Sequence, residues 1–217
     1  MNIQWFNLPF DVAFDVTSII ALIGLSLLLS ASLLRILCYF KINIKWAYTL
    51  SAVLFCISFV TISGYSLVTY LRGVFNDLSI TSLFLLSYYI FSVANHSSKE
   101  NDSNRSIFYL IALIGICFYP TALGLGTIDP YSWGFIGNPD HPLSSLVFIS
   151  SLALLMLFAF IKKHPLLLLC LVSGALAYSL NLLASQNIWD YYIDPLVFVY
   201  ALYAIGSIEI KKLSSLS

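Results

Sequence analysis

Hydrophobic residues run along the chain in long stretches that are separated by short polar connectors. A transmembrane helix needs about 20 mostly apolar residues, and seven stretches reach or approach this length. The pattern therefore predicts an all-α fold, a polytopic transmembrane helix bundle that forms a single domain over residues 1–217. The seven predicted spans are Val16–Phe40, Trp46–Tyr70, Leu78–Ala94, Ile107–Leu125, Leu143–Ile161, Leu166–Leu183 and Pro195–Ile210.

The seventh stretch is short, and it leaves an alternative open. It begins with Asp194 followed by Pro195, which places a capping carboxylate directly before a proline in the first helical turn. This pair is a typical helix start. In the alternative arrangement there are six spans, and Pro195–Ile210 lies partly at the membrane interface.

Composition agrees with a membrane location. Of the 217 residues, 60% are hydrophobic and 9% are charged, and the mean hydropathy is +0.92. Soluble domains are about 45–50% apolar and about 25% charged, so this chain has too little polar surface for a water-soluble globule. The net charge is zero, which gives no indication of a nucleic-acid partner. The lipid bilayer is the expected surrounding.

The basic residues predict the orientation of the bundle. Cytoplasmic loops of membrane proteins carry an excess of Lys and Arg. Arg72 alone falls on one side of the seven-span arrangement, so the N-terminus is predicted outside and the C-terminus in the cytoplasm. Short connectors, a retained first helix and abundant Ile, Leu and Ser favour a bacterial inner membrane. The basic residues on the other side are Arg35, Lys41, Lys45, Lys99, Arg105, Lys162, Lys163, Lys211 and Lys212.

Histidine and cysteine positions give no pattern for a metal or haem. Metal and haem sites in membrane helices need His or Cys ligands that converge from facing helices. The four cysteines all fall inside predicted spans, and the three histidines all fall in connectors. No cofactor is therefore expected.

Acidic residues gather on the predicted outer side. Four of them stand at the outer starts of spans, where a carboxylate can cap the helix and complement its dipole: Asp15, Asp77, Asp140 and Asp194. Asp129 and Asp190 differ, because they follow the outer C-terminal ends of spans four and six. Their surroundings, GTIDPYSWGF and NIWDYYIDPL, both combine Asp, Trp, Tyr and Pro.

These two loops define the candidate site. Asp129 and Asp190 form a candidate acid/base pair, but Asx turns that satisfy loop N–H groups are the favoured interpretation. Arg72 could clamp a phosphate or carboxylate, although pairing with a neighbouring acid is favoured. The candidate ligand-binding residues are Arg72, Tyr131, Trp133, Tyr178, Asn181, Trp189, Tyr191 and Tyr192.

Three functions from different classes remain open. The preferred one is a non-catalytic accessory subunit, whose aromatic and acidic periplasmic rim docks an envelope protein or a lipid-linked ligand. The first alternative is a small carrier or channel for a neutral or lipid-like solute, because hydroxyl-bearing residues are frequent inside the spans. The second alternative is an outer-leaflet enzyme that uses Asp129 and Asp190.

Overall fold

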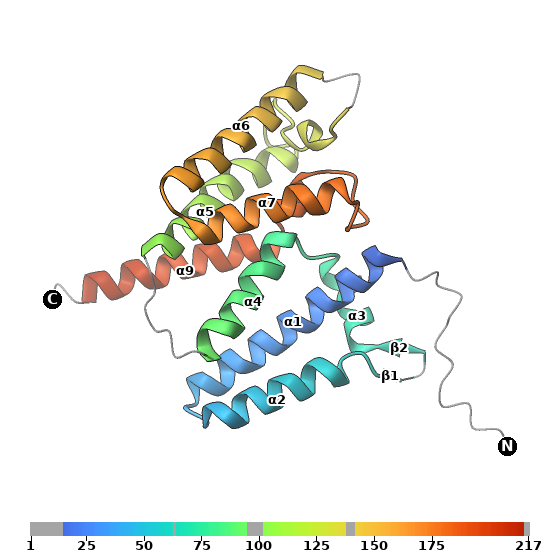
Figure 1. Ribbon diagram of the computed structural model, residues 1–217, viewed down its shortest axis with the longest axis vertical. Coiled ribbons are helices and arrows are strands. Elements are labelled where there is room, and N and C mark those ends of the chain that lie inside the picture. Colours follow the sequence, from blue (N-terminus) through green and yellow to red (C-terminus); the bar gives the residue numbers. More distant parts are fainter. Residues whose placement is uncertain (1–14, 63, 95–101, 138–141, 215–217) are drawn as a thin grey trace. The chain divides into compact units, whose positions relative to one another are not determined.

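The computed structural model describes residues 15–62, 64–94, 102–137 and 142–214, and these are mostly helical. They divide into two compact units, which are described separately (Figure 1). The first unit holds residues up to Leu78, Leu83–Ser97 and Asn181–Ala184, and the second holds Ser79–Ser82, Ser98–Leu180 and the chain from Ser185 onward. The elements are α1 (Val16–Tyr39), α2 (Ile44–Ile57), β1 (Thr61–Ile62), β2 (Tyr65–Ser66), α3 (Leu67–Phe75), α4 (Ile80–Ala94), α5 (Asp102–Ala122), η1 (Tyr131–Gly134), α6 (Pro142–Ile161), α7 (Pro165–Ser179), α8 (Trp189–Tyr192) and α9 (Pro195–Ser214).

In the first unit, α1 and α2 form an antiparallel pair that packs through serine side chains (Figure 1). The Ser26 hydroxyl donates to the carbonyl of Phe55 at 3.0 Å and lies 2.7 Å from the Ser58 hydroxyl. Ser26 and Ser58 are fully buried. Small side chains let helix backbones approach closely, and their hydroxyls then satisfy one another across the interface.

The other contacts of this unit fix the directions of its segments. Tyr48, near the start of α2, donates to the carbonyl of Ile90 near the end of α4 at 2.6 Å. Arg72 of α3 donates to Ser18 in the first turn of α1 at 3.1 Å. The chain thus runs along α1, returns through α2 and α3 to the beginning of α1, and runs back again in α4.

The predicted second span, Trp46–Tyr70, is wrong as one continuous helix. Helix α2 ends at Ile57, and α3 begins only at Leu67. Between them β1 and β2 pair as a two-stranded antiparallel hairpin, with Gly64 at a φ of +93° in its turn. Short hydroxyl side chains offer the backbone alternatives to helix, and Ser66 does so here by accepting from the N–H of Thr69 as the N-cap of α3. Apolar composition alone did not reveal this interruption.

The second unit is built from two antiparallel helix pairs (Figure 1). In the pair α5–α9, Phe198 at the start of α9 packs on Tyr119 near the end of α5, with ring centroids 4.9 Å apart. At the other end, Tyr109 donates to Glu209 at 2.8 Å. The pair α6–α7 is joined by a tight turn in which Lys163 has a φ of 55°. The ends of α5 and α7 and the starts of α6 and α9 lie next to the loops of the candidate site.

Asp194 serves the starts of two helices. One carboxylate oxygen accepts from the N–H of Val197 at 2.8 Å, so Asp194 caps α9 as its sequence position predicts. The other accepts from the N–H of Ser79 at 2.9 Å and from the Ser82 hydroxyl, in the residues that begin α4. Asp194 is buried. Helix starts carry unpaired N–H groups and a partial positive charge, which together favour a carboxylate there.

The other predicted caps have different outcomes. Asp15 caps α1, because it accepts from the N–H of Thr17 at 3.2 Å. Asp77 precedes α4 but forms an ion pair with Arg72. Asp140 lies outside the described residues.

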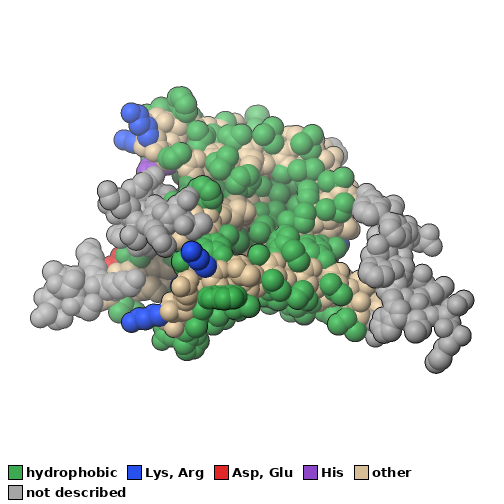
Figure 2. Space-filling model, turned by 60° about the horizontal axis from the view of Figure 1, so that its bottom comes forward, with side chains coloured by type: hydrophobic (Ala, Val, Ile, Leu, Met, Phe, Trp, Pro, Cys, Tyr) green, Lys and Arg blue, Asp and Glu red, His purple; other side chains and the backbone are tan. Residues whose placement is uncertain are grey.

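Among the described helices, α1 alone is both long and apolar enough to cross a membrane, and the other apolar stretches have 10–17 residues. Large apolar side chains are exposed along many of these helices. Among the side chains that Figure 2 colours by type, hydrophobic ones are far more numerous on the face shown than Lys, Arg, Asp, Glu or His. Large exposed apolar patches are typical of surfaces that contact a membrane or another protein.

Candidate functional site

The carboxylate of Asp129 is used by the loop that carries it. It accepts a hydrogen bond from the N–H of Tyr131 at 3.0 Å, which is the two-residue spacing of an Asx turn. The Ser132 hydroxyl donates to the Asp129 carbonyl at 2.7 Å. These bonds start the 3₁₀ turn η1, so Asp129 shapes the loop as the favoured sequence interpretation expects.

Asn187 joins this loop to the loop before α9. Its side-chain amide donates to the carbonyl of Tyr131 at 2.8 Å, and its side-chain oxygen accepts from the N–H of Trp189 at 3.0 Å. Its own N–H donates to the Ser185 hydroxyl at 3.0 Å. Asn187 is fully buried. Because both amide groups are used, this one side chain fixes the separation of the two loops.

Two further hydrogen bonds cross between the same loops. The indole N–H of Trp189 donates to the carbonyl of Pro130 at 2.8 Å. The N–H of Ile188 donates to the carbonyl of Gly134 at 3.0 Å. A Cβ added at Gly134 would lie 1.9 Å from the side-chain oxygen of Asn187 and 2.6 Å from Cδ1 of Trp189. Only glycine permits this approach.

The Asx turn that the sequence favoured is wrong for Asp190, because its carboxylate accepts two hydrogen bonds from side-chain hydroxyls of the two loops rather than from a backbone N–H. The phenol of Tyr131 donates to this carboxylate at 2.9 Å, and the Ser185 hydroxyl donates to the same oxygen at 2.5 Å. Burial, followed by the negative charge of Asp190, raises the pKa of Tyr131 to about 12. The phenol therefore stays protonated at neutral pH and acts as a donor. We call Pro130, Tyr131, Ser185, Asn187, Trp189 and Asp190 the loop clasp.

Aromatic rings support the loop clasp from the helices. The ring of Trp189 lies 4.7 Å from Phe118 of α5 and 4.7 Å from Phe148 of α6, measured between ring centroids. Both distances fall in the range of favourable aromatic pairs. The side chain of Trp189 is therefore held by packing on two helices as well as by its indole hydrogen bond.

The remaining tyrosines of the site are also held within the second unit. Tyr191 is fully buried, donates to the Ser185 carbonyl at 3.2 Å and packs edge-on against Tyr178. Tyr192 donates to the carbonyl of Leu171 at 2.9 Å, and burial raises the pKa of its phenol. These side chains support the loops of the site.

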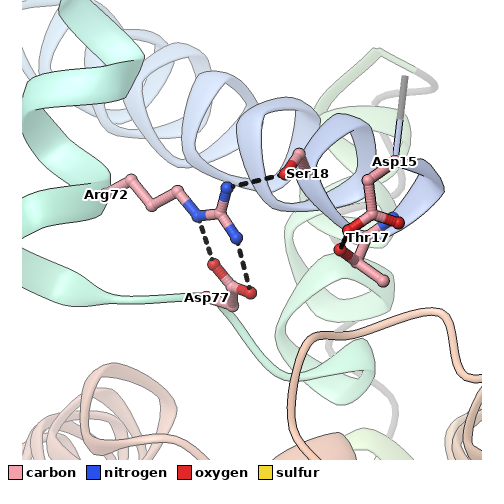
Figure 3. A network of polar contacts seen from close by, with 5 residues as sticks. All are labelled: Asp15, Thr17, Ser18, Arg72 and Asp77. Carbon is pink, nitrogen blue, oxygen red and sulfur yellow. Dashed lines mark hydrogen bonds and ion pairs between the residues drawn. The ribbon is translucent and has the colours of Figure 1, made fainter. Parts of the chain in front are cut away.

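Arg72 forms a separate polar network in the first unit (Figure 3). Its guanidinium donates to both carboxylate oxygens of Asp77, at 2.7 and 3.1 Å, and to Ser18 at 3.1 Å. The same figure shows Asp15 bonded to Thr17 in the first turn of α1. The Thr17 hydrogen bonds are the main cause that lowers the pKa of Asp15. The favoured pairing of Arg72 with an acid is thus observed, in a bidentate geometry that fixes both side chains.

The structure brings together five predicted site residues in one cluster: Tyr131, Tyr178, Trp189, Asp190 and Tyr191 are connected by hydrogen bonds or ring contacts. Two others belong to the first unit. Arg72 is paired as described, and Asn181 follows the end of α7 with a φ of 49°, the left-handed conformation that commonly ends helices. Trp133 is half-buried in η1, where its N–H donates to the carbonyl of Pro130.

Asn187 and Ser185 are central residues that the sequence did not reveal. Both stand in the polar segment ASQNIWD between two apolar stretches, which reads as an ordinary connector. Asn187 contacts Tyr131, which is more than 50 positions away, and Asn187 is fully buried. Neither property can be seen in the sequence of a short polar connector. Only the three-dimensional meeting of the two loops identifies them.

Next to the loop clasp, the chain between α5 and η1 exposes apolar side chains. Leu123 is 78% exposed, Leu125 is 81% exposed and Ile128 is 57% exposed. We call residues 123–128 the apolar loop. It leads directly into Asp129, whose Asx turn begins the clasped segment. A firmly held base thus carries an exposed apolar surface.

Among the described residues, no three His, Cys, Asp or Glu side chains lie close enough together to hold a metal ion. No protein-family model matches the sequence, and neither the curated proteins nor the solved structures contain a significant match.

Proposed function

We propose that the chain is a multi-pass membrane protein of a bacterial inner membrane, with seven crossings, an outer N-terminus and a cytoplasmic C-terminus. The alternating directions of α1, α2–α3 and α4 support this proposal, since each passes between the same two ends of the first unit. Lys41 and Lys45 lie at the junction of α1 and α2, and Arg72 lies at the opposite end of α1. This separation follows the charge rule for membrane topology.

Helix lengths add detail to the seven-span proposal. At 1.5 Å per residue, the 24 residues of α1 extend about 36 Å and the 20 residues of α9 about 30 Å, against a hydrocarbon thickness of about 30 Å. The apolar part of α9, residues 195–210, extends about 24 Å, and we propose that it crosses the bilayer rather than lying at the interface. Helices α4 and α7 have 15 residues, or about 22 Å, which local thinning of the bilayer accommodates.

The function we propose is that of a non-catalytic accessory subunit, which binds another membrane protein through the apolar loop. The observation that carries it is that the loop clasp uses its polar groups internally. Asp190 accepts from Tyr131 and Ser185, Asn187 is bonded on both sides, and Asp129 shapes its own turn. The N–H of Leu125 donates to the carbonyl of Pro120 at 2.9 Å, so the apolar loop is anchored to α5 at one end and to the Asp129 turn at the other, which lowers the entropic cost of binding.

The partner we propose is a protein with an apolar surface at the outer membrane boundary. Exposed leucine and isoleucine beside a carboxylate suit a protein surface that pairs apolar contact with a hydrogen-bond donor to Asp129. Asp129 is itself exposed, and a charged carboxylate is costly to bring into the hydrocarbon. A lipid-linked ligand that used the same loop would have to leave the hydrocarbon, because Asp129 keeps this loop at the water-facing side of the membrane boundary.

Stoichiometric co-purification in mild detergent tests this proposal. The unmodified chain should retain one partner protein at a fixed molar ratio, and Leu125→Ser together with Ile128→Ser should lower that ratio at least tenfold. Leu146→Ser is the matched control, because Leu146 is 60% exposed on α6 and outside the apolar loop. Recovery of the unmodified chain alone, or equal loss in the control, would contradict the proposal.

One observation favours the carrier alternative as a second candidate. The predicted second span is interrupted between α2 and α3, and interrupted helices form solute sites in many transporters. The Ser51 hydroxyl of α2 is buried and has no hydrogen-bond partner in the described structure. If a hydrated path reaches it, Ser51→Cys should react with a small charged thiol reagent and be protected by the transported solute. An unreactive Ser51→Cys would contradict this candidate.

The contacts of Asp129 and Asp190 give little support to the enzyme alternative. Asp129 and Asp190 both accept hydrogen bonds from the loops that they stabilise. Their carboxylates are better explained as structural groups than as an acid/base pair.

A further inference from the structure

The hairpin and α3 form a small element whose outward side chains are apolar. We call Thr61–Phe75 the outer hairpin segment. On α3, Leu67, Tyr70 and Val74 are exposed at spacings of three and four residues, which places them on one helix face. Val68 and Arg72, also four residues apart, lie on the face that contacts the rest of the unit. Ile62 and Tyr65 continue the exposed apolar surface onto the strands.

The charge of this segment is neutralised away from the exposed face. Arg72 is its only charged residue, and it is paired with both carboxylate oxygens of Asp77 (Figure 3). Tyr65 and Tyr70 stand together, with ring centroids 5.6 Å apart. Tyrosine side chains concentrate at the boundary between water and hydrocarbon, where the ring is apolar and the hydroxyl can reach water.

Contacts with α1 show how far the outer hairpin segment lies from the start of that helix. The Val68 N–H donates to the carbonyl of Ser58, whose side chain lies beside Ser26 of α1. Arg72 reaches Ser18. Ser18 and Ser26 lie about 3 and about 15 Å from the start of α1, at 1.5 Å per residue. The segment therefore lies beside the first three turns of the helix that is long enough to cross a membrane.

The hairpin backbone restricts the depth further. A two-stranded sheet leaves unpaired N–H and C=O groups along both outer edges. Such groups are very costly in hydrocarbon but can bond to water and headgroups at the interface. An amphipathic segment of this kind, next to the start of a spanning helix, suits the boundary between headgroups and acyl chains.

We propose that the outer hairpin segment lies in the outer membrane interface and binds the lipid surface through Leu67, Tyr70 and Val74. This inference rests on the proposed crossing of the bilayer by α1. It explains why the second predicted span is interrupted: α2 ends within the outer leaflet, and the chain completes its crossing through an interfacial element. The segment then sets the depth at which the first unit sits in the bilayer.

Site-directed spin labelling of the full chain in phospholipid vesicles tests this inference. In a chain without its four native cysteines, Leu67→Cys and Val74→Cys report on the segment, and Val53→Cys reports on the exposed side of α2, five residues farther than Ser58 from the outer end of the unit. Accessibility to oxygen and to a water-soluble nickel chelate gives the depth of each label. Labels at 67 and 74 should lie within about 10 Å of the headgroup boundary, and the label at 53 should lie deeper.

The possible outcomes separate the two proposals. If the label at 53 is deep but those at 67 and 74 are reached only by the chelate, or are as deep as the label at 53, the inference is wrong. If labels at 67 and 74 are shielded from both reagents, a protein covers this face, a second copy included, and the inference is again wrong. If the label at 53 is itself open to the chelate, the proposed crossing of the bilayer by α1 and its partner α2 fails, and the inference fails with it.

Discussion

Asn187→Ala tests whether the loop clasp is the stabilising element of the second unit. The substitution removes the amide that donates to the Tyr131 carbonyl and the oxygen that accepts from the Trp189 N–H. It leaves one acceptor and one donor without partners in a site where residue 187 is fully buried. Each such group costs about 1–3 kcal/mol. Because Tyr131 and Trp189 are half-buried and water can partly replace the lost bonds, we expect about 2–4 kcal/mol in total.

The assay is reversible unfolding by SDS in mixed micelles, followed by tryptophan fluorescence, with the free energy of unfolding extrapolated to zero SDS. Gln186→Ala is the matched control, since Gln186 is the exposed neighbour and only its backbone carbonyl accepts a hydrogen bond. Surface substitutions of this kind change stability by about 0.5 kcal/mol or less. If Asn187→Ala destabilises the protein no more than Gln186→Ala does, the loops are not held as described.

Three further predictions concern neighbouring groups. Gly134→Ala should destabilise the second unit by about 1–3 kcal/mol in the same assay, because the added methyl group would displace Asn187; an unchanged free energy would refute the close approach. In the unmodified chain, the raised pKa of Tyr131 should keep the free energy of unfolding at its full value below the unfolded pKa of about 10, and this contribution should be lost as the pH rises through the folded pKa of about 12. Tyr131→Phe should remove this pH-dependent loss. A pH profile identical to that of the unmodified chain would count against the buried phenol. Asp194→Ala should cost about 2–4 kcal/mol, because the N–H groups of Ser79 and Val197 lose their acceptor; a cost below 1 kcal/mol would show that water replaces it.

Much of the helical structure could be predicted from the chain. Helices α1, α4, α5, α6, α7 and α9 lie within five residues of predicted ranges at each end. The reason is local: apolar length and capping residues such as Asp15 and Asp194 determine where helices begin. The favoured Asx turn at Asp129 is equally local, since it depends on residues two apart.

The features that were not predicted depend on contacts between distant segments. The hairpin after α2 lies in a stretch whose Val, Thr and Ile are as apolar as a helix needs but also favour strands. Hydropathy averages cannot separate these two outcomes. The pairing of Arg72 with Asp77 rather than another acid is likewise a result of the turn between α3 and α4.

In the candidate site, too, local features could be predicted from the sequence and contacts between distant segments could not. The sequence placed the two aromatic loops in one candidate site, but it gave no indication of the residue that connects them. The structure connects them through Asn187, a residue of an unremarkable polar connector. Buried polar side chains of this kind are recognised only when their partners are known, because polarity in a sequence usually marks exposure.

The most direct test of the account is the compartment in which the apolar loop lies. In a chain without native cysteines, Ile128→Cys and Lys163→Cys place single thiols on the apolar loop and in the turn between α6 and α7, both at exposed positions. In intact cells with a permeable outer envelope, a membrane-impermeant maleimide should label position 128 at once and position 163 only after the inner membrane is opened. Labelling of both positions before opening, or of neither, would contradict a membrane-spanning chain with an outward-facing apolar loop.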